Sequence, residues 1–142
     1  MRRGATLSAA MAALALSACV SGREPIEGPA HCAIGEAMVE TQLFLGLSKP
    51  SGGTVSAAQW ESFLKQEIAP RFPEGFSVLD GSGFWRDGQT RRTIAEKSKV
   101  VVRLHPPGPA ADTAIDEIAQ AYKRQFAQES VLRVDRPVCA QF

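Results

Sequence analysis

The sequence contains little of several residue types on which protein chemistry commonly depends. Among its 142 residues are two histidines, three cysteines and one tyrosine, and 16 basic residues nearly balance 15 acidic ones. A chain so close to neutrality lacks the positive charge that would attract nucleic acid or an anionic lipid surface. It also lacks a C-x-x-C or H-x-x-x-H spacing, a nucleophile elbow, a catalytic triad and paired acids. These absences favour a protein that is not an enzyme and that uses no metal or cofactor.

The N-terminus has no apolar run long enough to span a membrane, but it has the three zones of a secretory signal. Arg2 and Arg3 supply positive charge, the segment 7–16 is apolar, and small residues follow it. A spanning helix needs about 20 apolar residues, so this shorter run predicts a cleaved signal peptide over residues 1–18.

The residues at 16–19 (Leu-Ser-Ala-Cys) resemble a lipobox, the recognition site of bacterial lipoprotein signal peptidase. The resemblance implies that Cys19 becomes the first mature residue and carries lipid, which anchors the protein to a membrane. An ordinary signal with a chance cysteine at its end is the alternative. Val20 in place of an aspartate favours the outer membrane, facing the periplasm. The predicted organisation is a signal at 1–18, a lipidated N-terminus and tether at 19–36, and one α+β domain at 37–142.

The domain alternates between strand and helix patterns. Residues repeating with period two predict strands at 41–47, 76–79, 98–105 and 130–136, with 84–85 continuing the second strand after a bulge or bend at 80–83. Residues at helical spacing predict one helix that Ser56 and Gln59 cap and Pro70 stops, and another that Asp112 or Thr113 caps and that runs to Phe126. The order β-α-β-β-α-β predicts a ferredoxin-like sandwich. Its antiparallel sheet has the order 4-1-3-2, and both helices cover one face.

Three cysteines need a partner or a modification. Lipidation of Cys19 leaves Cys32 and Cys139 as a pair, and the predicted topology places the entry to the first strand beside the exit of the last. We therefore predict a Cys32–Cys139 disulfide. The alternative is a zinc site in which His31 and His105 join the two thiols, although the spacing of these residues carries no zinc signature.

Several blocks of the sequence, in order, are similar to a bacterial family of unknown function. The blocks are TQLFLGL at 41–47, GGTVS at 52–56, Trp60, IAPRFPEG at 68–75, DGSGFW at 80–85, EKSKV at 96–100 and YKRQFAQESVLR at 122–133. Together they resemble domain-of-unknown-function family 3574, whose members are often small predicted lipoproteins. The resemblance covers about residues 38–142. It implies a class and a location, and it transfers no catalytic residue.

The uncovered face of the predicted sheet is the candidate binding surface. With Leu43, Val102 and Leu132 directed toward the helices, we expect the opposite face to consist of Phe44, Trp85, Val101, Arg103, His105, Val131, Arg133 and Asp135. Mixed apolar and arginine surface is typical of recognition patches, although a loop or the N-terminal segment covering a solvated face is the plainer alternative.

These patterns predict a membrane-anchored envelope lipoprotein of unknown activity, acting as a recognition or assembly module through its open sheet face. Its partner would be a second copy or another envelope protein. The competing interpretation is a small-ligand binder or enzyme with a pocket near Trp85, Arg103 and His105.

Overall fold

The computed structural model describes residues 26–86, 88 and 90–142. The predicted signal peptide, Cys19 and the first part of the predicted tether lie outside the described residues. None of the helices in the described part is long and apolar enough to cross a membrane.

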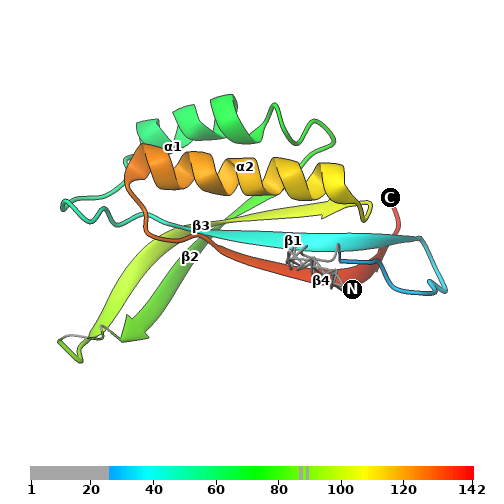
Figure 1. The fold of residues 1–142 in the computed structure, drawn as a ribbon, viewed down its shortest axis with the longest axis horizontal. Helices are drawn as coiled ribbons and strands as arrows, with labels where there is room; N and C mark the ends of the chain where they lie inside the picture. Colours follow the sequence, from blue (N-terminus) through cyan, green and yellow to red (C-terminus); the bar gives the residue numbers. More distant parts are fainter. Residues whose placement is uncertain (1–25, 87, 89) are drawn as a thin grey trace, which may run out of the picture.

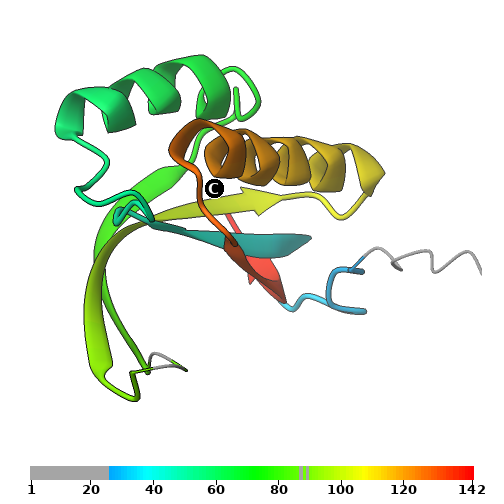
Figure 2. The same ribbon diagram turned by 60° about the vertical axis from the view of Figure 1, so that its left-hand side comes forward.

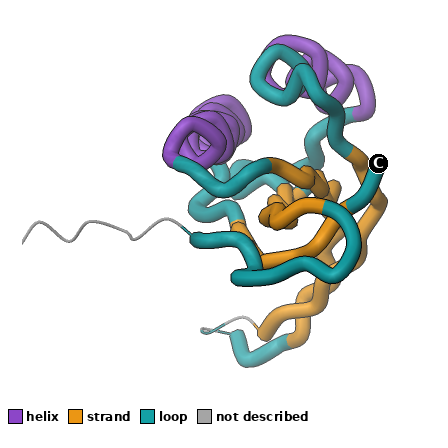
Figure 3. The backbone as a smooth tube through the Cα atoms, turned by 90° about the vertical axis from the view of Figure 1, so that its right-hand side faces the viewer, coloured by secondary structure: helices purple, strands orange, loops and turns teal. Residues whose placement is uncertain are grey.

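Within this part, four antiparallel strands form one sheet in the order β2-β3-β1-β4. The strands are β1 (Glu36–Gly46), β2 (Ser77–Arg86), β3 (Thr93–His105) and β4 (Leu132–Ala140). The helices are α1 (Ala57–Phe63), which continues into the π-helical turn η1 (Leu64–Ile68), and α2 (Pro109–Phe126). Both helices lie on the same face of the sheet (Figures 1 and 3). The predicted fold class and strand order are confirmed.

The helix boundaries follow from local chemistry. At α1, the Ser56 side chain accepts a hydrogen bond from the Gln59 backbone, and the Gln59 side chain accepts one from the Ser56 backbone, as the capping box predicts. Helix α2 begins at Pro109, three residues earlier than the predicted cap at Asp112. The prediction of its start was wrong because proline fits the first helical turn, where the missing N–H would have no partner inside the helix.

Strand β2 is longer and more regular than the sequence suggests. Its residues pair one to one with β3 from Ser77 to Arg86, so no bulge interrupts it at the predicted position. A Cβ at Gly81 would lie 2.6 Å from the Ser98 Oγ, which explains why glycine stands there. The distal parts of β2 and β3 instead bend away from the helices (Figures 1 and 2).

The core lies between the sheet and the two helices. Its aromatic residues come from the predicted helix stripes: the ring of Phe63 packs 5.1 Å from Tyr122 and 5.7 Å from Phe126. The Tyr122 hydroxyl donates a 2.7 Å hydrogen bond to the Gly46 carbonyl at the end of β1. Burial, with the Glu96 carboxylate nearby, raises the pKa of Tyr122, so its hydroxyl keeps the proton that it donates.

The disulfide between Cys32 and Cys139 is present, with the two Cα atoms 5.6 Å apart. Cys139 lies opposite Ala37 in the β1–β4 ladder, so the bridge joins the segment before β1 to the end of β4. Gly35 makes this approach possible: its φ is +78°, and a Cβ there would lie 2.2 Å from the Ala140 carbonyl oxygen. The disulfide uses both thiols, which rules out the alternative zinc site. Among the residues described, no group of three or more His, Cys, Asp or Glu side chains is placed to hold a metal ion.

Candidate functional site: the open sheet face

The strand register shows which residues face away from the helices. Leu43 and Val101 belong to the buried core and lie opposite each other on β1 and β3. Because side chains alternate along a strand and directly opposed residues share a face, their neighbours Phe44 and Val100 point to the other side. We call this side the open face. It consists of Glu36, Met38, Glu40, Gln42, Phe44, Ser77, Leu79, Val100, Val102, Leu104, Leu132, Val134, Arg136 and Val138.

The predicted composition of this face was wrong for six residues. Val101, Arg103 and His105 on β3, and Val131, Arg133 and Asp135 at β4, lie on the helix side: their contacts are with the core, α2 and the loop before β2. The prediction assumed that aliphatic residues on β3 and β4 point inward. The open face is instead apolar, and the helix side becomes polar near the start of α2, where Arg133 reaches two aspartates.

Aliphatic and aromatic side chains cross the whole open face in a single row. Leu79 lies opposite Val100, Val100 opposite Phe44, and Phe44 opposite Leu132, so the row includes one residue from each strand. Its outer members are well exposed, Leu79 at 56% and Leu132 at 58%, and Val134 on the next row is 41% exposed. Exposed apolar area of this extent usually marks a binding surface.

One ion pair lies among these apolar residues. Arg136 donates a 2.6 Å hydrogen bond to Glu40, whose carboxylate also accepts one of 2.6 Å from Gln42. The hydrogen bonds from Gln42 and Arg136 hold the pKa of Glu40 below its ordinary value. These two charges, in the middle of the open face, therefore neutralise each other.

A second exposed apolar group lies on the bent part of the β2–β3 hairpin. We call the described residues 82–86 and 90–97 the hairpin arm. Phe84 is 72% exposed and Trp85 48%, and Trp85 lies opposite the exposed Ile94. Figure 2 shows the arm extending past the open face on the side away from the helices. Trp85 on β2 is thus half-exposed, but it pairs with Ile94 at the start of β3, far from Arg103 and His105 at the end of that strand.

His105 and Asp135, which were predicted on the open face, form a buried hydrogen-bond network with Thr41 on the helix side. Thr41 donates a 2.5 Å hydrogen bond to Asp135 and lies 2.9 Å from His105 Nε2. His105 Nδ1 lies 2.9 Å from the Pro106 carbonyl oxygen. Contacts at both ring nitrogens therefore fix the orientation of the imidazole on the helix side of the sheet.

Arg133 connects this network to α2. Its guanidinium contacts Asp112 and Asp116 on the helix and Asp135 on its own strand, with only 10% of the side chain exposed. Burial alone lowers the pKa of Arg133, but the hydrogen bonds that it donates to Asp112 and Asp135 outweigh burial and raise the pKa. This residue joins sheet to helix and is not available to a partner on the open face.

Arg103 also makes its contacts within the domain. Its guanidinium stacks 4.3 Å from the centre of the Phe72 ring, and its Nη2 lies 3.5 Å from Glu74. The buried Nε has no hydrogen-bond partner among the described residues. The predicted pocket near Trp85, Arg103 and His105 does not form, because two of these residues are buried on one face and Trp85 is on the hairpin arm.

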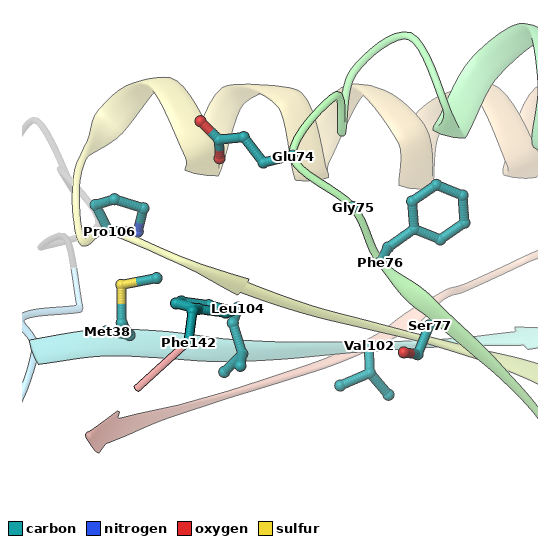
Figure 4. Close-up of a pocket in the computed structure, with 9 residues that line it drawn as sticks. All are labelled: Met38, Glu74, Gly75, Phe76, Ser77, Val102, Leu104, Pro106 and Phe142. Atoms are coloured by element: carbon teal, nitrogen blue, oxygen red, sulfur yellow. The ribbon is translucent and has the colours of Figure 1, made fainter. Parts of the chain in front are cut away.

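A pocket of about 540 Å³ lies elsewhere, at the end of the open face where β2 begins and β3 ends. It is lined by Met38, Glu74, Gly75, Phe76, Ser77, Val102, Leu104, Pro106 and Phe142. Figure 4 shows Val102 and Leu104 pointing away from α2, whereas Glu74 and Phe76 lie nearer the helix. Apart from Glu74 and Ser77, the side chains that line the pocket are apolar.

The model of the family described as "Protein of unknown function (DUF3574)" matches residues 40–142, the greater part of the chain. The chain belongs to the DUF3574 family. The family resemblance predicted from the sequence is therefore confirmed, and the match carries no activity with it. No curated protein matches this DUF3574 member.

Two solved structures share the fold of this DUF3574 domain. A phage SAM lyase in complex with S-methyl-5'-thioadenosine is 17% identical, with a TM-score of 0.55 over 76% of this chain and 86% of that one. The phage SAM lyase in its apo state is 19% identical, with a TM-score of 0.51 over 79% and 97%. Identities this low establish a common fold and nothing further.

Proposed function

We propose that this protein is an exported lipoprotein, anchored in the bacterial cell envelope through lipid on Cys19, whose domain is a recognition or assembly module that uses the open face. The lipobox resemblance at 16–19 supports the anchor, and Val20 supports the outer membrane with the domain facing the periplasm. The observation that carries the function is the row of apolar side chains across all four strands.

The open face has the properties of an interface core. Aliphatic residues dominate it, its one ion pair is internally satisfied, and its outer leucines are more than half exposed. Burying such side chains contributes about 25 cal/mol per Å² of apolar area. A monomer that left this face in water would lose that contribution, so a partner surface is the simplest reason for its composition.

Native mass measurement of the protein, extracted from the envelope in mild detergent, tests this function. We expect the wild type to form an assembly whose mass exceeds that of one chain, and the Leu132→Asp variant to have the mass of one chain. Leu132 is exposed, so the aspartate leaves the fold intact. The matched control is Ile34→Asp, which places the same charge at another exposed aliphatic residue, off the open face. A wild type at the mass of one chain, or an assembly that Leu132→Asp leaves intact, would contradict the proposal.

The anchor has its own test. When cells grow with a labelled fatty acid, the wild type should be labelled and the Cys19→Ser variant should not. The variant should also either keep its signal peptide or be released from the membrane. Equal labelling of both proteins would show that Cys19 is not the lipidated residue.

The pocket at the end of the open face supports a second candidate, the binding of a small molecule. Its size is typical of small-ligand sites, and its lining combines an apolar wall with the Glu74 carboxylate, which can accept hydrogen bonds from an amino or hydroxyl group. The phage SAM lyase with this fold is described in complex with S-methyl-5'-thioadenosine, which makes that nucleoside a suitable first probe.

Thermal unfolding in the presence of S-methyl-5'-thioadenosine tests the second candidate. A ligand present at 100 times its dissociation constant stabilises a protein by about 2.7 kcal/mol. We expect a rise in Tm for the wild type and a smaller one for Glu74→Gln, with adenine alone as the control. No rise at millimolar nucleoside would exclude this ligand.

A further inference from the structure

We propose that the occupant of the open face is a second copy of this chain, so that the protein forms a two-fold homodimer with its sheets face to face. This inference rests on the proposed function and names the partner. Three features of the described residues carry it: the size of the face, its charge and the shape of the hairpin arm.

The face is large enough for a modest dimer interface. Four strands spaced about 4.8 Å apart give a width of about 19 Å, and nine residues of β4 at about 3.4 Å each give a length of about 31 Å. Two such faces would bury about 1,200 Å² in total, the lower end of the range for specific protein interfaces. Sheets packed in this way lie about 10 Å apart, the distance that interleaved leucine and valine side chains fill.

The charge of the face allows a copy to meet itself. A two-fold interface brings the same surface together twice, so any net charge would repel its own image. In the middle of the open face the charged residues are Glu40 and Arg136, which pair at 2.6 Å and sum to zero, whereas the exposed Glu36 lies at the rim, opposite Ala140 at the end of β4. A lipid surface fits less well, because docking on anionic lipid needs an excess of basic residues that this face does not have.

The hairpin arm supplies the part of the contact that a flat sheet cannot. It extends past the open face on the side away from the helices (Figure 2), and its exposed Trp85 and Ile94 share the strand face of Leu79 and Val100, whereas Phe84 is on the opposite strand face. Two copies related by a two-fold axis would each place this arm against the other, adding aromatic area at the edge of the interface. Such a dimer would also cover the pocket, since Met38, Val102 and Leu104 belong to both the pocket lining and the open face.

Photo-crosslinking in the native envelope tests the inference on the full chain. A photoreactive amino acid replaces Leu132 in one protein and Ile34 in the control, and the products are separated by mass. We expect a product at twice the protein's own mass from position 132, little from position 34, and coelution of two differently tagged copies. A second variant adds Leu132→Asp to a chain with the photoreactive residue at Leu79, and we expect its dimer product to fall about tenfold or more.

The other outcomes separate this inference from the proposed function. A product from position 132 whose mass shows a different protein would overturn the homodimer and leave the recognition function in place. If position 132 gives no more crosslinked protein than position 34, both the homodimer and the recognition function are overturned. A lipid surface or the N-terminal segment on the open face would give that result.

Discussion

Removing the Cys32–Cys139 disulfide should destabilise the domain by several kcal/mol. The bridge spans 107 residues of sequence, nearly the whole domain. A cross-link of that span removes loop-closure entropy from the unfolded chain worth about 4.8 kcal/mol at 25 °C. In the folded state the β1–β4 ladder already holds Ala37 opposite Cys139, so the bridge adds little to the native geometry and acts mainly on the unfolded chain.

The expected loss is large on the scale of the whole protein. Stabilities of single domains lie at about 5–15 kcal/mol, and in a domain of this size 1 kcal/mol moves the Tm by about 4 °C. We therefore expect the Tm of the Cys32→Ser, Cys139→Ser double variant to lie about 15–20 °C below that of the wild type in scanning calorimetry. The circular dichroism of the folded state should be unchanged, because the sheet register does not depend on the bridge.

Reduced wild-type protein is the control, and it should unfold at the temperature of the double variant. A shift below about 5 °C would refute the reasoning from loop entropy. Two thiols that react with iodoacetamide in the unreduced, unfolded wild type would show that the disulfide does not form at all.

Three further predictions concern single side chains. Arg133→Leu should destabilise the domain by about 3–5 kcal/mol in chemical denaturation, because it leaves the buried Asp135 and the partly buried Asp112 without their counter-charge, and a loss below about 1 kcal/mol would contradict that role. Glu40→Gln should be less stable than the wild type at neutral pH. Since the folded pKa of Glu40 is lowered from 4.5, the stability it contributes is present above that pH and is lost as the pH falls through the lower folded pKa; a difference between the two proteins that does not shrink in acid would refute this. Ser56→Ala should cost about 1 kcal/mol through loss of the α1 cap, while the exposed Ala58→Ser change in the same helix should cost less.

The sequence alone was sufficient to predict the topology. Element order limits the sheet to one favoured arrangement, and that arrangement places Cys32 beside Cys139. The capping pair at Ser56 and Gln59 marked the start of α1 because both hydrogen bonds are local. Predictions of this kind depend on short-range chemistry and on few topological choices, which is why the structure confirms them.

The faces of β3 and β4 could not be assigned in the same way. Alternation shows which residues share a side, and the choice between the two sides depends on what each side meets. Arg133 and Asp135 point inward because α2 presents Asp112 and Asp116 to Arg133, a contact between residues 17 to 21 positions apart. The spacing of those two aspartates by one helical turn was the available signal. The exposed face was missed because its residues, such as Leu132 and Val134, have the composition of a core.

The rate of thiol labelling tests whether the open face is covered when the protein is in the intact envelope. With Cys32 and Cys139 in a disulfide and Cys19 lipidated, a cysteine introduced by Leu132→Cys is the reactive thiol, and Ala58→Cys on α1 is the exposed reference. In the intact envelope we predict that a maleimide labels position 132 about tenfold more slowly than position 58, and that the two rates become similar once the protein is extracted and diluted. Equal labelling of both positions in the intact envelope would contradict the account.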